Sequence, residues 1–260
     1  MGSILLDIDG VLHLSGAPTP GGPEAIARLR EQGHRLRFLT NNTTRARAQL
    51  ASELAGIGYE LDEEEIQTTP LAAASALSGK RVFALTMNAV RGDLAEGLEL
   101  VDRAAEVVLL GGADETDETG RVFAWENLNA AFAELEDGAE LYCLHKNRWW
   151  QTGRGPLLDA GAFVAGLEYA AGTSATVLGK PSRPYFEAAL DALGAEPGET
   201  TMVGDDVDAD IGGAKMLGLR GVLVRTGKFR EETLAAADPK PDEVIDSLAD
   251  LPSLLESWPA

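Results

Sequence analysis

The sequence is poor in cysteine, in basic residues and in long apolar runs. Cys143 is the one cysteine among 260 residues, so no disulfide can form within the chain, and we expect a reducing compartment. Lysine and arginine number 22 against 42 aspartates and glutamates, and the resulting formal charge of −20 disfavours nucleic acid and anionic membranes as partners. No apolar run reaches the roughly 18 residues of a membrane span. Because the first strand is expected close to Met1, we predict a cytoplasmic protein without a signal peptide.

Short apolar runs alternate with helical periodicities at both ends of the chain. The runs predict strands at 4–7, 36–40, 201–203 and 221–224, and the periodicities predict helices at 23–32, 45–55, 184–193 and 208–217. Strands and helices in alternation imply right-handed parallel crossovers. We therefore predict an α/β fold with a doubly wound, Rossmann-like parallel sheet.

The middle of the chain carries a second set of elements. Strands are expected near 82–86, 106–110 and 141–145, and helices near 122–135 and 161–171. About a hundred residues of this kind can fold as a separate small α/β domain. We predict a core domain made of residues 1–73 and 177–260, with residues 74–176 inserted into it.

The first strand ends in two carboxylates, Asp7 and Asp9, followed by Gly10. Residues i and i+2 share one face of a strand, where two like charges at close range repel by a few kcal/mol. A divalent cation between them would relieve that repulsion. Such a pair suits a nucleophile and a proton-transfer group that serve one substrate, whereas a chance D-x-D-G turn is the structural alternative.

The strand at 36–40 leads into a run of hydroxyls and amides, with Thr40, Asn41 and Asn42 foremost. Parallel sheets gather ligands at the carboxyl ends of their strands, and backbone N–H groups at a helix start favour an anion. We expect either Thr43 or Thr44 to cap the following helix.

Lys180 lies between Gly179 and Pro181, just after the inserted segment. These neighbours restrict the backbone at a strand-to-helix turn and would aim the ammonium at the same sheet edge, although a solvated lysine is the structural alternative. The stretch is not a P-loop, because Ser174 replaces a required glycine and Pro181 a required Ser or Thr.

Four acids fall within six residues at 205–210. Helix capping accounts for one or two of them, and we assign it to Asp208. An EF-hand is excluded because its sixth position would be Ile211 rather than glycine and its twelfth Leu217 rather than glutamate. A Mg²⁺ site shared with the two carboxylates of the first strand fits better.

These four motifs, in this order and each after an expected strand, resemble the haloacid dehalogenase superfamily of phosphotransferases. The long insertion is similar to the large α/β cap, of the C2 type, in its NagD-like subclass. Residues 144–150 and 166–170 resemble the branch of the phospholysine phosphohistidine inorganic pyrophosphate phosphatases. The likeness covers nearly the whole chain.

The resemblance implies a Mg²⁺-dependent phosphatase that works through an aspartyl-phosphate. Asp7 would be the nucleophile and Asp9 the general acid and base. Mg²⁺ would be held by Asp7, the backbone carbonyl of Asp9 and Asp205. The supporting residues implied by the resemblance are Thr40, Asn41, Asn42 and Lys180 for phosphate, with Asp206 and Asp210 behind the metal ligands.

The inserted cap would cover the site and set the substrate, a small phosphorylated metabolite, with pyrophosphate and phosphoramidates also candidates. The resemblance further implies a homodimer formed through the cap. Two alternatives stay open, a non-catalytic metal-dependent binding module and a phosphomutase. Asp9 counts against the first, since a binder needs no proton-transfer acid, and against a dehalogenase, which attacks carbon.

Overall fold

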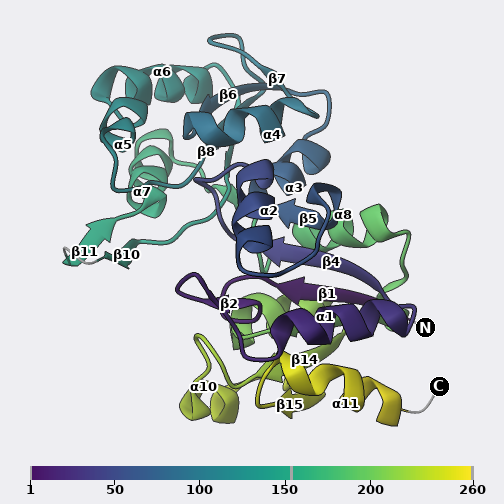
Figure 1. Cartoon of the computed structure of the whole chain (residues 1–260). Helices are drawn as coiled ribbons and strands as arrows, with labels where there is room; N and C mark the ends of the chain where they lie inside the picture. The colour runs from purple at the N-terminus through teal and green to yellow at the C-terminus, as the bar shows by residue number, and fades with distance from the viewer. Residues whose placement is uncertain (1, 153–154, 259–260) are drawn as a thin grey trace. The chain divides into compact units, whose positions relative to one another are not determined.

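The chain folds into two compact α/β units, seen in a computed structural model that describes residues 2–152 and 155–258 (Figure 1). The first unit comprises Met1–Thr40, Ala48–Gln67 and Lys180–Ala260, and the second comprises Asn41–Arg47 and Thr68–Gly179. Residues 41–47, 68–73 and 177–179 therefore cluster with the second unit, outside the boundaries expected from the sequence. The role of the second unit as a substrate-specificity cap stays a prediction.

A six-stranded sheet forms the centre of the first unit, in the order β15-β14-β13-β1-β4-β5. Its strands are β1 (Ser3–Asp7), β4 (Arg35–Thr40), β5 (Ile66–Thr68), β13 (Thr200–Gly204), β14 (Arg220–Val224) and β15 (Glu243–Ile245). β1 pairs in parallel with both β13 and β4, which places Leu5 opposite Met202 and Arg37. The chain winds outward from β1 in both directions, and the predicted doubly wound sheet is confirmed.

Both faces of β1 are buried, which explains its nearly unbroken apolar sequence. Ile4 and Leu6 belong to a core cluster that also contains residues of α1 (Gly22–Glu31) and α11 (Leu251–Ser257), two helices that lie against each other (Figure 1). Each fully buried leucine of this kind stabilises the fold by about 2 kcal/mol. The other helices of the unit are α2 (Arg47–Gly56), α8 (Arg183–Leu193), α9 (Gly213–Met216) and α10 (Glu231–Ala236).

The second unit has its own parallel sheet, in the order β12-β9-β8-β6-β7. The strands are β6 (Arg81–Leu85), β7 (Glu99–Leu100), β8 (Val107–Leu110), β9 (Glu140–Cys143) and β12 (Thr176–Val177), with a hairpin of β10 (Trp149–Thr152) and β11 (Gly155–Leu158). The helices are α3 (Thr69–Ala76), α4 (Arg91–Ala95), α5 (Asp117–Val122), α6 (Trp125–Glu136) and α7 (Ala160–Ala171). Burial raises the pKa of Cys143 to about 12, so this thiol is inert.

Two helices differ from the expected ones. The helix expected at 122–135 is α6, which begins only at Trp125 because Ala124 is extended, while Val122 is the last residue of the separate helix α5. The Asn127 amide donates to the carbonyls of Arg121 and Val122 at the end of α5. The helix expected at 208–217 begins instead as a π-helical segment, η4 (Val207–Gly212), before α9.

The Tyr185 hydroxyl links the end of β4 to the neighbouring strand β5. It lies 2.9 Å from the carbonyl of Thr40 and 3.0 Å from that of Gln67, and it accepts the N–H of Thr40 at 3.0 Å. The side chain is fully buried, on α8. One phenol thereby fixes the last residue of β4, which belongs to the motif with Asn41 and Asn42.

Tyr185→Phe removes these buried hydrogen bonds, so it is expected to lower the free energy of unfolding by roughly 1–3 kcal/mol in urea titrations. Tyr169→Phe is the matched control, since Tyr169 is 92% exposed, and its effect should stay within about 0.5 kcal/mol. Equal losses in the two variants would contradict the assigned role of Tyr185.

Candidate active site

Three buried aspartates meet at the carboxyl edge of the first unit's sheet. β1 ends at Asp7, and its parallel neighbour β13 leads directly into Asp205, while Asp210 lies on η4. One carboxylate oxygen from each of the three lies within 4.8 Å of the others. The sequence placed Asp210 behind the metal ligands, whereas the structure groups it with Asp7 and Asp205.

Lys180 supplies the ammonium at the centre of this cluster. Its Nζ lies 2.5 Å from Oδ1 of Asp7 and 2.7 Å from Oδ1 of Asp210. The lysine side chain is only 4% exposed, so the alternative of a solvated surface lysine is excluded. Asp210 and Asp7 therefore hold the Lys180 ammonium between them.

The charges in the cluster do not balance. Burial alone would lower the pKa of Lys180, but Asp210 and Asp7 outweigh it and hold that pKa well above the usual range. Burial raises the pKa of Asp7 well above its usual value. Lys180 acts to lower that pKa, whereas the carboxylates of Asp210 and Asp205 raise it further. Three carboxylates with one ammonium leave an excess of negative charge, which a cation would offset.

Asp205 has one oxygen fixed and one free. Its Oδ2 accepts the backbone N–H of Lys228 at 2.7 Å, whereas its Oδ1 is buried and has no hydrogen-bond partner among the described residues. A buried oxygen left unpaired is costly unless something binds it. Hard carboxylate oxygens and this orphaned atom together fit Mg²⁺.

Glycines make room for these carboxylates. A Cβ on Gly10, whose φ is +90°, would lie 1.9 Å from Oδ2 of Asp205. A Cβ on Gly204 would lie 2.3 Å from the Asp210 side chain. The glycines of the D-x-D-G and G-D-D motifs are therefore required by the close approach of the acids.

Asp9 lies beyond the end of β1 and is exposed, unlike Asp7. Thr40 Oγ1 donates to Oδ2 of Asp9 at 3.0 Å, and Nε2 of His13 lies 3.5 Å from Oδ1. The Thr40 hydroxyl, predicted to bind phosphate, is thus bonded to the predicted general acid. His13 comes from the short hairpin of β2 (His13–Leu14) and β3 (Ala17–Pro18), and the sequence reasoning missed it.

Asn41 and Asn42 belong to the second unit, and their binding of phosphate stays a prediction. Asn41 Oδ1 accepts the Thr69 hydroxyl at 3.3 Å, while Asn42 Oδ1 accepts the N–H groups of Thr44 and Arg45 at 3.1 and 2.9 Å.

The expected cap of α2 by Thr43 or Thr44 is therefore wrong. Asn42 closes the turn that precedes the helix. The first helical N–H, that of Arg47, donates to Oδ2 of Asp93 at 2.9 Å. Thr43 Oγ1 instead lies 3.1 Å from Nε2 of His145 in the second unit.

The cap of η4 is Asp206 rather than the expected Asp208. Asp206 Oδ1 accepts the N–H groups of Asp208 and Ala209 at 3.1 and 3.0 Å, and Asp208 is exposed. The helix begins one residue earlier than expected, so the capping position moves to the last extended residue, Asp206. The N–H of Asp206 also donates to Oδ2 of Asp210 at 3.1 Å.

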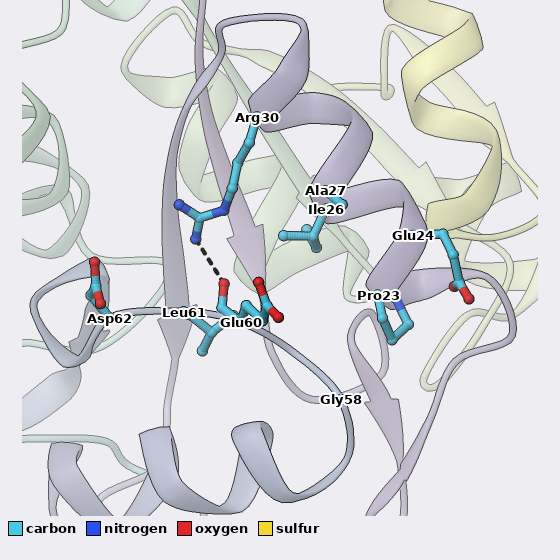
Figure 2. Close-up of a pocket in the computed structure, with 9 residues that line it drawn as sticks. All are labelled: Pro23, Glu24, Ile26, Ala27, Arg30, Gly58, Glu60, Leu61 and Asp62. Carbon is cyan, nitrogen blue, oxygen red and sulfur yellow. Dashed lines mark hydrogen bonds between the residues drawn. The ribbon is translucent and has the colours of Figure 1, made fainter.

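A cavity of 720 Å³ lies elsewhere in the first unit, along α1 and residues 58–62 (Figure 2). Arg30 crosses it and donates to the Glu60 carbonyl, and its guanidinium also pairs with Glu65 at 2.6 Å. The lining contains none of the site residues described above, so we assign it no part in the chemistry.

Known families and proteins with similar sequences agree with the family that the order of the four motifs resembles. A model described as haloacid dehalogenase-like hydrolase matches residues 4–99, and a second, HAD-hydrolase-like model matches residues 177–251. The haloacid dehalogenase-like hydrolase domain-containing protein 2 of Bos taurus is 39% identical over 92% of this chain and 90% of its own length. The phospholysine phosphohistidine inorganic pyrophosphate phosphatase of Homo sapiens is 37% identical over 97% of this chain and 93% of its own.

Solved structures show the same fold across nearly the whole chain. A p-nitrophenyl phosphatase from Archaeoglobus fulgidus superposes with a TM-score of 0.86 at 30% identity, covering 97% of this chain and 98% of its own. NagD from E. coli K-12 superposes with a TM-score of 0.85 at 26% identity, covering 96% of this chain and 98% of its own. A glycerol phosphate phosphatase from Mycobacterium tuberculosis, in complex with magnesium, superposes with a TM-score of 0.82 at 28% identity, covering 96% of this chain and 76% of its own.

The fold, the edge carboxylates and these relatives define a class of hydrolases built on a doubly wound sheet. The chain belongs to the haloacid dehalogenase-like hydrolase family. Within residues 2–152 and 155–258, no helix is long and apolar enough to cross a membrane.

Without a metal, the ionised Asp205 side chain makes the stability of the protein depend on pH. Burial raises its pKa from 3.8 to about 6, so its contribution to stability without metal is fully present below about pH 4 and is lost as the pH rises through 6. In EDTA at pH 8, Asp205→Asn is therefore expected to melt a few degrees higher than the wild type. The difference in melting temperature, measured by differential scanning calorimetry, should disappear by pH 4. A variant that is less stable than the wild type at pH 8 would contradict this account.

Proposed function

We propose that the protein is a Mg²⁺-dependent phosphatase that hydrolyses small phosphorylated metabolites through an aspartyl-phosphate on Asp7. The observation that carries this proposal is the buried cluster in which Lys180 contacts Asp7 and Asp210 beside the partly unpaired Asp205. Such a cluster is costly to bury and has little purpose unless a cation and an anion enter it.

Electrostatics explains why a phosphate ester needs this environment. A carboxylate that approaches a phosphate dianion at ~4 Å meets a repulsion of about 8 kcal/mol at an effective dielectric of 20. Lys180 offsets part of it and keeps its charge because two carboxylates raise its pKa. Mg²⁺, when bound by Asp7, Asp205 and the Asp9 carbonyl, would supply the remaining positive charge and polarise the phosphoryl oxygens.

In the first half-reaction the Asp7 carboxylate attacks phosphorus, and the bond from phosphorus to the leaving oxygen breaks. Asp9 gives its proton to that oxygen. In the second half-reaction Asp9 takes a proton from water, which attacks the phosphorus of the aspartyl-phosphate. The bond from phosphorus to the Asp7 oxygen breaks, which regenerates the Asp7 carboxylate and releases inorganic phosphate. The Thr40 hydroxyl, 3.0 Å from Asp9, holds that carboxyl in place for both transfers.

The relatives support a phosphate-ester or phosphoanhydride substrate. Their names describe phosphatases of p-nitrophenyl phosphate, of glycerol phosphate and of phospholysine, phosphohistidine and pyrophosphate. Lys180, Thr40, Asn41 and Asn42 are proposed to hold the phosphoryl oxygens, with Asp206 and Asp210 as supporting acids. The substrate-setting cap, a homodimer through it and a cytoplasmic location stay predictions.

The purified protein is expected to hydrolyse p-nitrophenyl phosphate with Mg²⁺ and to lose that activity in EDTA. Asp7→Asn removes the nucleophile and should lower kcat by about 10³-fold or more, measured by release of p-nitrophenolate. Asp208→Asn is the matched control, since this aspartate is exposed on the same motif, and it should keep the wild-type rate.

Full turnover by the Asp7→Asn variant would rule out the nucleophile. Mg²⁺ binding without any turnover, across sugar phosphates, nucleotides, pyrophosphate and phosphoamino acids, would favour the non-catalytic binding module instead. Transfer of the phosphoryl group to a second sugar hydroxyl, rather than to water, would identify a phosphomutase.

A further inference from the structure

The loop that follows β14 contacts both acidic motifs. Thr226 Oγ1 donates to the carbonyl of Gly10 at 2.5 Å. Lys228 donates twice, through its backbone N–H to Oδ2 of Asp205 at 2.7 Å and through Nζ to Oδ2 of Asp206 at 3.1 Å. Residues 226–228, which the sequence reasoning did not single out, therefore join the D-x-D-G turn to the G-D-D turn.

Gly227 packs against the same carboxylate. Its φ is +59°, and a Cβ at this position would lie 1.9 Å from Oδ2 of Asp205 and 2.8 Å from Cα of Gly10. Asp205 Oδ2 is already held by the N–H of Lys228, and the atom of Gly10 is its backbone Cα, so neither partner can easily move away by such a distance. Asp205 Oδ2 is thus enclosed between two glycines, Gly10 and Gly227.

This enclosure determines which oxygen of Asp205 remains available. The N–H of Lys228 occupies Oδ2, and Oδ1 is left buried without a partner among the described residues. A carboxylate held at one oxygen has little rotational freedom left, so binding a cation through the other oxygen costs less entropy.

We propose that residues 226–228 form a positioning loop that fixes Asp205 for Mg²⁺. The proposal rests on the metal site of the proposed function and assigns no catalytic role to the loop itself. Partners that orient metal ligands in this way typically change metal affinity 10- to 100-fold when they are disrupted.

The test is Mg²⁺ binding by the full chain, measured by isothermal titration calorimetry with Mg²⁺ alone. Gly227→Ala is expected to raise the Kd for Mg²⁺ at least ~10-fold. Gly218→Ala is the matched control, because Gly218 also has a positive φ, of +86°, but a Cβ there meets no atom within 4 Å. It reports backbone strain alone and should bind Mg²⁺ as the wild type does.

A second pair of variants covers the case in which Gly227→Ala fails to fold. Thr226→Val removes the donor to Gly10 and should weaken Mg²⁺ several-fold, whereas Thr226→Ser keeps the hydroxyl and should restore the wild-type Kd. Wild-type affinity in both Thr226→Val and any folded Gly227→Ala would overturn the positioning role. A wild-type protein that binds no Mg²⁺ would instead overturn the metal site of the proposed function, and the loop proposal with it.

Discussion

The contact of the Lys180 ammonium with Asp7 and Asp210 is the constraint around which the site is arranged. Burying these charges costs several kcal/mol of desolvation per ion, and pairing them recovers only part of that cost. Since Asp205 adds a third buried carboxylate, the cluster weakens the fold in the absence of a cation. That arrangement agrees with the proposed function, in which a Mg²⁺ ion and a phosphate enter the cluster together.

The parallel sheet makes this concentration of charge possible. β1 and β13 are neighbours that end at the same edge, so Asp7 and Asp205 are brought together although about two hundred residues separate them in the chain. Gly10, Gly204 and Gly227 then let carboxylates approach the backbone more closely than any Cβ would allow. The core supplies rigidity, and the glycines supply space.

The sheet and the four motifs could be predicted because their signals are local. Three of the motifs follow strands of the first unit's sheet within a few residues, and parallel strands gather such residues at one edge, whereas Lys180 follows β12 of the second unit's sheet. The choice among adjacent polar residues could not be predicted in the same way. Whether Asp206 or Asp208 caps the helix depends on which residue is the last extended one, and sequence boundaries are not resolved that finely. The role of Asn42 was missed for a related reason, because α2 begins at Arg47, later than expected.

The contributions of Tyr185 and of residues 226–228 were missed for a different reason. Their hydrogen bonds reach backbone groups far away in the sequence, and their neighbours carry no motif. A T-G-K run after a strand at the ligand edge was the available signal for the loop. No such signal existed for Tyr185, because the sequence pattern of an amphipathic helix predicts only that its tyrosine packs in the hydrophobic core.

The central claim is that Asp7 carries the phosphoryl group during turnover. Rapid acid quenching of the enzyme with substrate and Mg²⁺, followed by peptide mass spectrometry, tests it most directly. We predict a phosphoryl group on the peptide that contains Asp7, located at that carboxylate and absent when substrate is omitted. Turnover with no phosphorylated enzyme at any quench time, or with the phosphoryl group on another residue, would contradict the account.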